Sequence, residues 1–205
     1  MNTNLEFSKK EYDVIINSDF ILTKNRIVKK IYTLYGELAE EYKRFLNEYS
    51  SCLPHEIFIV TPKIYKGEQY NELPYVMLDY PRLFSKTNVF AIRSFFWWGN
   101  YFSITLQLSG TYLKMYADNI FDFVNDKKNK DWYFGVHESE WEHHFEKDNY
   151  VRIDELNKND LIKLKSKSFI KIAKRLSLED WKVADKFFME EYKTLLQIIC
   201  KKLIT

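Results

Sequence analysis

Residues 101–109 alternate strictly between apolar and polar side chains, which is the period of a β-strand whose two faces meet different surroundings. A second strand-like run precedes it at residues 89–98. The pair Gly99-Asn100 separates the two runs, and a two-residue Gly-Asn loop is typical of a tight hairpin. We therefore predict that the two runs form an antiparallel β-hairpin.

The register of this hairpin decides which side chains share a face of the sheet. A two-residue turn would pair Trp98 with Tyr101, and directly opposed residues lie on the same face. Counting back places Arg93 opposite Leu106, on a face that is otherwise apolar. The other face would combine rings and hydroxyls, as the floor of a ligand pocket does. The alternative is that a helix covers this face and its hydroxyls bond locally. The residues expected to bind a ligand are Arg93, Phe96, Trp98, Ser103, Thr105 and Arg82.

Arg93 needs a partner if it lies on an apolar face, because a guanidinium group stays charged and is costly to bury alone. We predict that it meets a carboxylate, several carbonyl oxygens or a cavity that admits an anion. Asp79 and Glu56 are candidate carboxylates, as is a glutamate of the first long helix. A wider anion site would join Arg93 to other basic and tyrosine side chains, and separate ion pairs are the alternative. The side chains that would join Arg93 in this wider anion site are Lys63, Arg82, Tyr65, Tyr75 and Tyr80.

Helical periodicity appears on both sides of the strand region. Residues 23–49 carry one apolar face at a period of 3.6, and residues 111–124, 168–176 and 178–203 show the same pattern. Near the N-terminus, Ser8 and Glu11 have the spacing of a capping box, which predicts a short first helix.

Two further strand-like runs, residues 57–65 and 73–80, precede the central hairpin, and their prolines predict edge positions or bulges. Shorter strands are expected at 132–136 and 150–153. Helices before and after a block of strands indicate an α+β fold, with an antiparallel β-sheet of about five or six strands flanked by long N- and C-terminal amphipathic helices. Aromatic residues make up 18% of the chain, which favours a thick sheet core.

No repeat or flexible linker divides the chain, so we expect a single α+β domain over residues 1–205. Its organisation is predicted to be helical over 1–50, mainly β over 55–110, mixed over 111–155 and helical over 156–205.

Residues 137–146 hold three of the four histidines. Ser139 and Glu142 have capping-box spacing, which predicts a short helix on which Glu140 shares a face with the histidines three and four positions later. Such a cluster could hold a divalent metal and support a metal-dependent, hydrolase-like enzyme. The alternative is a solvated acidic helix start. The candidate metal ligands are His137, Glu140, His143 and His144, and no other cofactor is expected.

A basic stripe at helical spacing runs through residues 163–175, and it could contact nucleic acid or an anionic membrane if this segment is a helix. A solvated Lys-rich face is the alternative. Its members are Lys163, Lys167, Lys171, Lys174 and Arg175.

Cellular location is predicted from the cysteines and the chain ends. Cys52 and Cys200 lack metal-like spacing, so we expect buried thiols in a reducing compartment. The N-terminus has no apolar signal region, and no stretch approaches the roughly 18 apolar residues of a membrane span. We expect a soluble, cytoplasmic protein.

The formal net charge of +2 selects no partner, and the chain contains none of the common phosphate-loop, dinucleotide or nucleophile-elbow motifs. The leading hypothesis is therefore a non-enzymatic protein whose aromatic and hydroxyl-bearing sheet face binds a small molecule or a protein. A nucleic acid is the less favoured partner.

Overall fold

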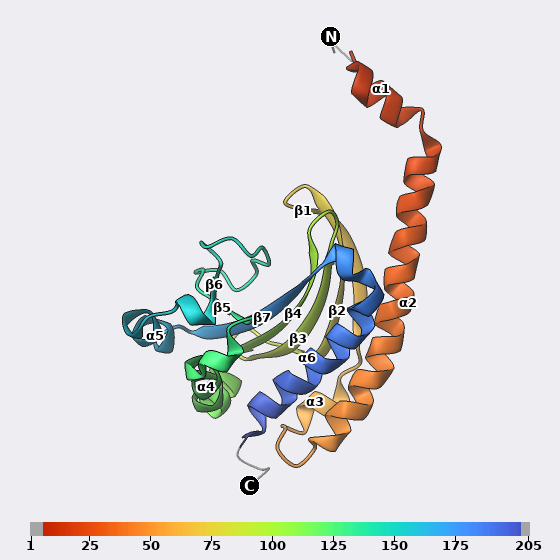
Figure 1. Ribbon diagram of the computed structural model, residues 1–205. Helices are drawn as coiled ribbons and strands as arrows, with labels where there is room; N and C mark the ends of the chain where they lie inside the picture. The colour runs from red at the N-terminus through yellow and green to blue at the C-terminus, as the bar shows by residue number, and fades with distance from the viewer. Residues whose placement is uncertain (1–5, 202–205) are drawn as a thin grey trace.

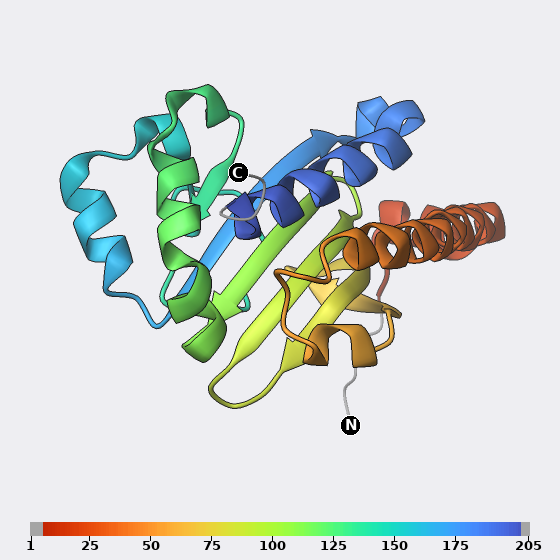
Figure 2. The same ribbon diagram turned by 90° about the horizontal axis from the view of Figure 1, so that it is seen from below.

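A seven-stranded antiparallel sheet with helices packed on one face forms the centre of the protein, as the computed structural model of residues 6–201 shows (Figures 1 and 2). The strand order is β1-β2-β3-β4-β7-β5-β6. The predicted α+β class is confirmed. The strands are β1 Lys63–Tyr70, β2 Leu73–Phe84, β3 Val89–Trp97, β4 Tyr101–Ser109, β5 Tyr133–Gly135, β6 Tyr150–Arg152 and β7 Phe169–Ser177.

The long helices are α2 and α6, and both pack on the same face of the sheet (Figure 2). The predicted capping box at Ser8 and Glu11 is present at the start of the first helix. The helices are α1 Lys9–Ile15, α2 Ser18–Glu48, α3 Glu56–Ile59, α4 Gly110–Asn125, α5 Lys158–Lys165 and α6 Ala184–Ile199. Short 3-10 segments occupy Lys127–Asn129, Ile153–Glu155 and Leu178–Val183.

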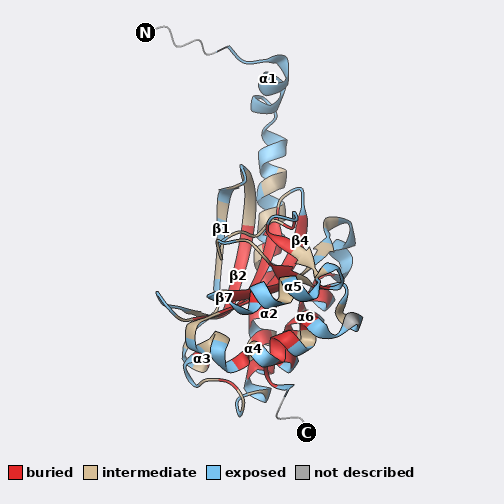
Figure 3. Cartoon of the chain, turned by 90° about the vertical axis from the view of Figure 1, so that its left-hand side faces the viewer, coloured by how far each residue is buried: buried red, intermediate tan, exposed pale blue. Residues whose placement is uncertain are grey.

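Aromatic rings join the two long helices to each other and to the sheet. The ring of Tyr42 in α2 stacks on that of Tyr192 in α6 with centroids 3.7 Å apart. Phe188 of α6 meets Tyr35 of α2 and Phe102 of β4 edge-on, at 5.6 and 5.9 Å. Edge-to-face and offset pairs stabilise such cores beyond the area they bury. The aromatic residues of the sequence thus build a thick core between the helices and the sheet. Figure 3 shows buried stretches on the strands and on the helices that cover them.

The predicted hairpin forms from β3 and β4, but its turn has three residues instead of two. Trp97 pairs with Tyr101, so the predicted pairing of Trp98 with Tyr101 is wrong by one residue. The backbone N–H of Trp98 donates to the carbonyl of Pro74 in β2 at 2.9 Å, which places Trp98 in the turn. Gly99 follows with a φ of 74°, a conformation that glycine adopts without strain.

The shift exchanges the predicted partners across the hairpin. Arg93 lies opposite Thr105, not Leu106. The alternation within each strand is as predicted, but the apolar side chains of β4 share their face with Phe96, and the polar ones share the opposite face with Arg93. The prediction was therefore right about which residues within one strand share a face, and wrong about which residues of the other strand lie on that face with them.

Two predicted helices are absent from the described chain. Residues 169–177 form strand β7, inserted between β4 and β5, so the helix expected over 168–176 was wrong. Residues 136–149 form a loop that contains turns but no helix, so the helix expected to begin at Ser139 was also wrong. The basic residues of 163–175 consequently do not lie on a single helix face. The strand expected from residue 57 starts at Lys63, after the short helix α3.

Cys52 and Cys200 form a disulfide, which corrects the expectation of two free thiols. Cys52 lies in the turn after α2 and Cys200 at the end of α6, so the bond links the ends of the two helices that cover the sheet. Within residues 6–201, no helix combines the length and the apolar character needed to cross a membrane.

Candidate functional site

The sheet face opposite α2 and α6 carries the polar groups, and the 136–149 loop lies against it. Two rows of facing residues cross this face. One row runs from Asp79 through Arg93 and Thr105 to Ala173, and the other from Arg82 through Ala91 and Gln107 to Lys171. All except Arg82 are buried. We call this surface the loop face.

A β-bulge places Arg82 on the loop face. Asp79 pairs with Arg93 and Arg82 pairs with Ala91, so β2 has one more residue than β3 in this interval. If the same residues paired regularly without a bulge, Arg82, three positions after Asp79, would point to the opposite face. The bulge contains Pro81, which has no N–H to donate to a neighbouring strand. A bulge was one of the two outcomes that the prolines of these strands predicted.

A pocket of about 220 Å³ opens at this point of the loop face. It brings together four of the side chains expected to form an anion site, namely Lys63, Tyr65, Arg82 and Arg93. Tyr75 is not part of its lining, and Tyr80 points into the core on the helix side. The pocket is lined by Lys63, Tyr65, Asp79, Arg82, Phe84, Arg93 and Trp141, and we call it the basic pocket.

Arg93 finds the carboxylate that the sequence predicted for it. Its Nε donates to Oδ1 of Asp79 at 2.8 Å, and its second guanidinium nitrogen donates to Oδ2 at 3.2 Å. Both side chains are buried. The hydroxyl of Tyr65 donates to the same Oδ2 at 3.1 Å. Burial raises the pKa of Tyr65, which keeps this hydroxyl protonated and able to donate.

The two other cations of the basic pocket have no carboxylate partner among residues 6–201. The Nε of Arg82 donates to the carbonyl of Thr61 at 2.8 Å, which fixes the guanidinium but does not neutralise it. The ammonium of Lys63 lies 5.3 Å from the ring centroid of Tyr65. Asp79 is the one acid in the lining, against three cations, so the basic pocket carries a net charge of +2.

Aromatic rings form the outer wall of the basic pocket. Trp141, which the 136–149 loop contributes, lies with its ring centroid 6.1 Å from that of Phe84. Phe84 in turn lies under the guanidinium of Arg93, 5.8 Å from its central carbon. The pocket therefore combines flat apolar surface with positive charge.

His143 of the 136–149 loop and Lys171 of β7 lie near Arg93, where the loop meets the sheet. A terminal nitrogen of Arg93 lies 3.4 Å from Nε2 of His143. Burial, with Arg93 and Lys171 nearby, holds the pKa of His143 well below its usual value, so the neutral ring accepts this bond at Nε2. Burial lowers the pKa of Lys171 to about 7, and its ammonium donates to the carbonyl of Glu142.

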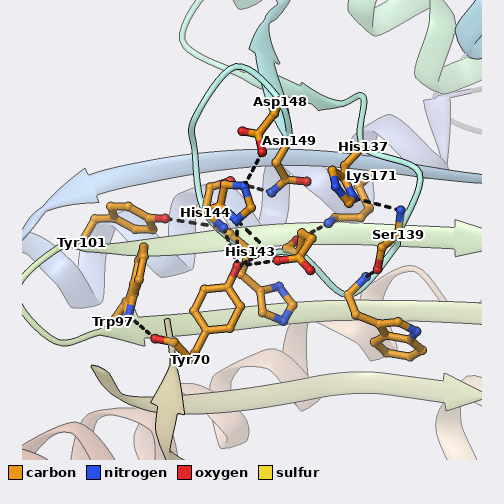
Figure 4. Close-up of polar contacts among 12 residues, drawn as sticks. Tyr70, Trp97, Tyr101, His137, Ser139, His143, His144, Asp148, Asn149 and Lys171 are labelled. Atoms are coloured by element: carbon orange, nitrogen blue, oxygen red, sulfur yellow. Dashed lines mark hydrogen bonds and ion pairs between the residues drawn. The ribbon is translucent and has the colours of Figure 1, made fainter. Parts of the chain in front are cut away.

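Tyr70, at the end of β1, anchors the 136–149 loop to the sheet (Figure 4). Its hydroxyl oxygen accepts from the backbone N–H groups of His143 and His144 at 2.6 and 3.0 Å. The hydroxyl lies 3.2 Å from the carboxylate of Glu142. Burial raises the pKa of Tyr70 to about 12, so this anchor stays protonated at physiological pH.

The candidate metal ligands each have a separate partner within the described chain. His137 Nδ1 accepts from the N–H of Ser139 at 2.9 Å, and Glu140 accepts from Gln107 at 2.8 Å. His144 Nε2 lies 3.3 Å from Asp148 (Figure 4). Over residues 6–201, no group of three or more His, Cys, Asp or Glu is arranged to hold a metal ion. The metal-dependent interpretation gains no support from this geometry.

The remaining residues expected to bind a ligand lie outside the basic pocket. Ser103 and Thr105 are buried on the loop face but do not line the basic pocket. Phe96 and Trp98 lie on the helix side, where they line a separate apolar pocket of about 300 Å³ with Ile27 and Trp181. The one-residue shift of the hairpin separates these two groups.

The basic residues of 163–175 are divided among different surroundings. Lys167 donates to the carbonyls of Val136 and His137 at 2.8 and 2.7 Å, and Lys171 is buried on the loop face. Lys174 points to the helix side, where it binds Glu191 at 2.6 Å. No continuous basic surface results from this segment.

The sequence grouped Lys63 with Arg82 and Arg93 but gave no sign of Trp141 beside them, because Trp141 comes from a loop whose path no local pattern reports. Comparisons with protein-family models, curated proteins and solved structures give no match for this chain. Its function has to be inferred from its own residues.

Proposed function

We propose that this protein binds a small anionic ligand, a phosphate or carboxylate compound that carries a flat apolar group, in the basic pocket. The observation that carries the proposal is that Asp79 is already occupied by Arg93 and Tyr65, while Lys63 and Arg82 face the cavity without a carboxylate. An anion in the cavity would receive charge-assisted hydrogen bonds from both.

The pocket's size and walls narrow the ligand class. A volume of about 220 Å³ lies below the range of drug-sized sites, so a compact compound is expected. Phe84 and Trp141 offer ring faces for a flat apolar group beside the anion. A small molecule is therefore favoured over a nucleic acid, whose extended backbone requires a longer basic surface.

The test is calorimetric titration of the purified protein with inorganic phosphate, phenyl phosphate and benzoate at constant ionic strength. We expect saturable binding, tighter for phenyl phosphate than for phosphate. The variant Arg82→Gln should lose about tenfold to a hundredfold in affinity, as expected for one charge-assisted bond. Arg44→Gln, which alters an exposed arginine of α2 that lies outside the pocket, is the matched control. Equally weak binding of phenyl phosphate by the native protein, Arg82→Gln and Arg44→Gln would contradict the proposal.

The fluorescence of Trp141 provides a second test of binding in the basic pocket. This fluorescence should change as phenyl phosphate binds, and Trp141→Phe should remove that change while preserving most of the affinity. A fluorescence change that persists in Trp141→Phe would place the ligand elsewhere.

A further inference from the structure

The N-terminal arm, residues 6–22, projects away from the body of the protein (Figures 1 and 3). It comprises α1 and the beginning of α2. No residue between 6 and 30 is buried, and the first buried position of α2 is Ile31. Eight large apolar residues of the arm are each between 48% and 61% exposed: Phe7, Tyr12, Val14, Ile15, Ile16, Phe20, Ile21 and Leu22.

The arm exposes more apolar surface than a soluble monomer usually does. A half-exposed side chain of this size presents on the order of 100 Å², so the eight together present roughly 800 Å². The largest apolar patch of a typical monomer is about 300–600 Å². A standard interface buries about 800 Å² on each partner, which is the area available here.

Short helices also need a packing partner. Helix α1 has seven residues and none of them is buried, whereas isolated helices below about 12 residues are marginal in water. The capping box at Ser8 stabilises its first turn but does not replace tertiary packing. A surface that covers the arm would supply that packing.

The distribution of apolar residues around the arm favours a protein surface over a membrane surface. A helix that lies on a membrane has one apolar face and one strongly charged face. Here Val14, Ile15 and Ile16 are consecutive, as are Phe20, Ile21 and Leu22, and three successive residues span about 200° of a helix. A flat membrane would leave part of this surface in water. A helical protein partner, whose side chains interdigitate with those of the arm, would cover more of it than a flat surface does.

We propose that the arm is a self-association surface, and that two copies of this chain pack their arms against each other in a two-fold dimer. A two-fold interface uses the same patch on both copies, and homodimer interfaces are the more apolar kind. The patch spans residues 7–22, so an antiparallel arrangement about its midpoint brings Lys10 of each copy to the level of Asp19 of the other. Opposite charges would then flank the apolar contact.

The test is sedimentation velocity of the full chain over the micromolar concentration range. We expect a concentration-dependent dimer for the native protein. The double variant Ile15→Lys/Ile21→Lys should be monomeric, with a dissociation constant raised at least a hundredfold. Ile59→Lys, at a similarly exposed apolar residue outside the arm, should dimerise as the native protein does. A native protein that is monomeric throughout, or a dimer that the arm variant leaves unchanged, would overturn the proposal.

Disulfide cross-linking between two copies provides an independent test of the dimer. Val14→Cys should form an intermolecular disulfide on mild oxidation, whereas Met115→Cys, at another exposed position, should not. Near-ultraviolet circular dichroism of the arm variants should match the native spectrum, because the core begins at Ile31. If the native protein is monomeric and co-sediments with anionic vesicles through the arm, the surface binds lipid and the dimer is excluded.

Discussion

Arg93 and Asp79 face each other on neighbouring strands and share two hydrogen bonds in a buried pair. Removing one partner leaves an uncompensated charge, which costs about 3–5 kcal/mol, whereas removing both often costs much less. We expect Asp79→Leu and Arg93→Met to be strongly destabilising alone, and Asp79→Leu/Arg93→Met to be less destabilising than the two single effects combined. Urea unfolding of the four proteins measures the coupling, and simple additivity would mean that the pair is not coupled.

Lys171 predicts a stability that rises with pH. Its pKa is about 7 in the folded protein against 10.5 for a free lysine, so between these values the unfolded chain binds more protons than the native protein. Stability should therefore increase by about 2–3 kcal/mol from pH 6 to pH 9. Lys171→Met should flatten this increase, and Lys163→Met, at an exposed lysine, should not. Equal pH profiles for the native protein and Lys171→Met, measured by urea unfolding, would refute the assignment.

His143 predicts a loss of stability in acid. Its pKa in the native protein lies well below 6.5, so the unfolded chain takes up a proton as the pH falls below that value, while the native protein does not. Stability should fall as pH decreases from about 6.5. His143→Gln should reduce this fall because its amide cannot ionise. His55→Gln, at an exposed histidine, is the control, and thermal unfolding at pH 5 and pH 7 measures both.

The Cys52–Cys200 disulfide should contribute strongly to stability, because 148 residues separate its ends. The chain-entropy model gives about 4–5 kcal/mol for a loop of this length. Dithiothreitol should lower the urea midpoint of the native protein and leave Cys52→Ser/Cys200→Ser unchanged. A native midpoint that does not respond to the reductant, in a sample whose thiols titrate as reduced, would show that the bond contributes little.

The strand alternation of β4 and the long helical periodicity of α2 could be predicted from sequence because each buries one face against one environment. The hairpin turn could not, since its length depends on the bond between the Trp98 amide and the carbonyl of Pro74, which lies on another strand. A tertiary contact therefore decided a register that local turn chemistry predicted one residue differently.

The sequence of strand β7 predicts a helix, and this prediction is wrong for a comparable reason. Phe169, Ile172 and Leu176 recur at helical spacing, and Lys171 interrupts the alternation expected of a buried strand. Only the loop above it, which supplies the carbonyl of Glu142, makes a lysine acceptable there. Residues 139–142 likewise resemble a helix start, but Glu142 lies within hydrogen-bonding distance of Tyr70, 72 residues earlier in the chain.

The convergence of Lys63, Arg82 and Arg93 was open to prediction as a possibility, since all three are basic residues of one strand region. Their shared face depends on the bulge in β2, and a single extra residue at that point decides whether Arg82 joins the pocket or the core. Sequence patterns report the presence of a proline there but not the direction in which the next side chain points.

The position of β7 has a consequence for synthesis of the protein on the ribosome. Because β7 lies between β4 and β5, the β1–β4 half of the sheet has an unpaired strand at the β4 edge until residues 169–177 have emerged. An open edge of this kind is a template for pairing with other chains. Nascent chains that are stalled before residue 169 should thus be more prone to aggregate, or to recruit chaperones, than chains in which β7 is complete.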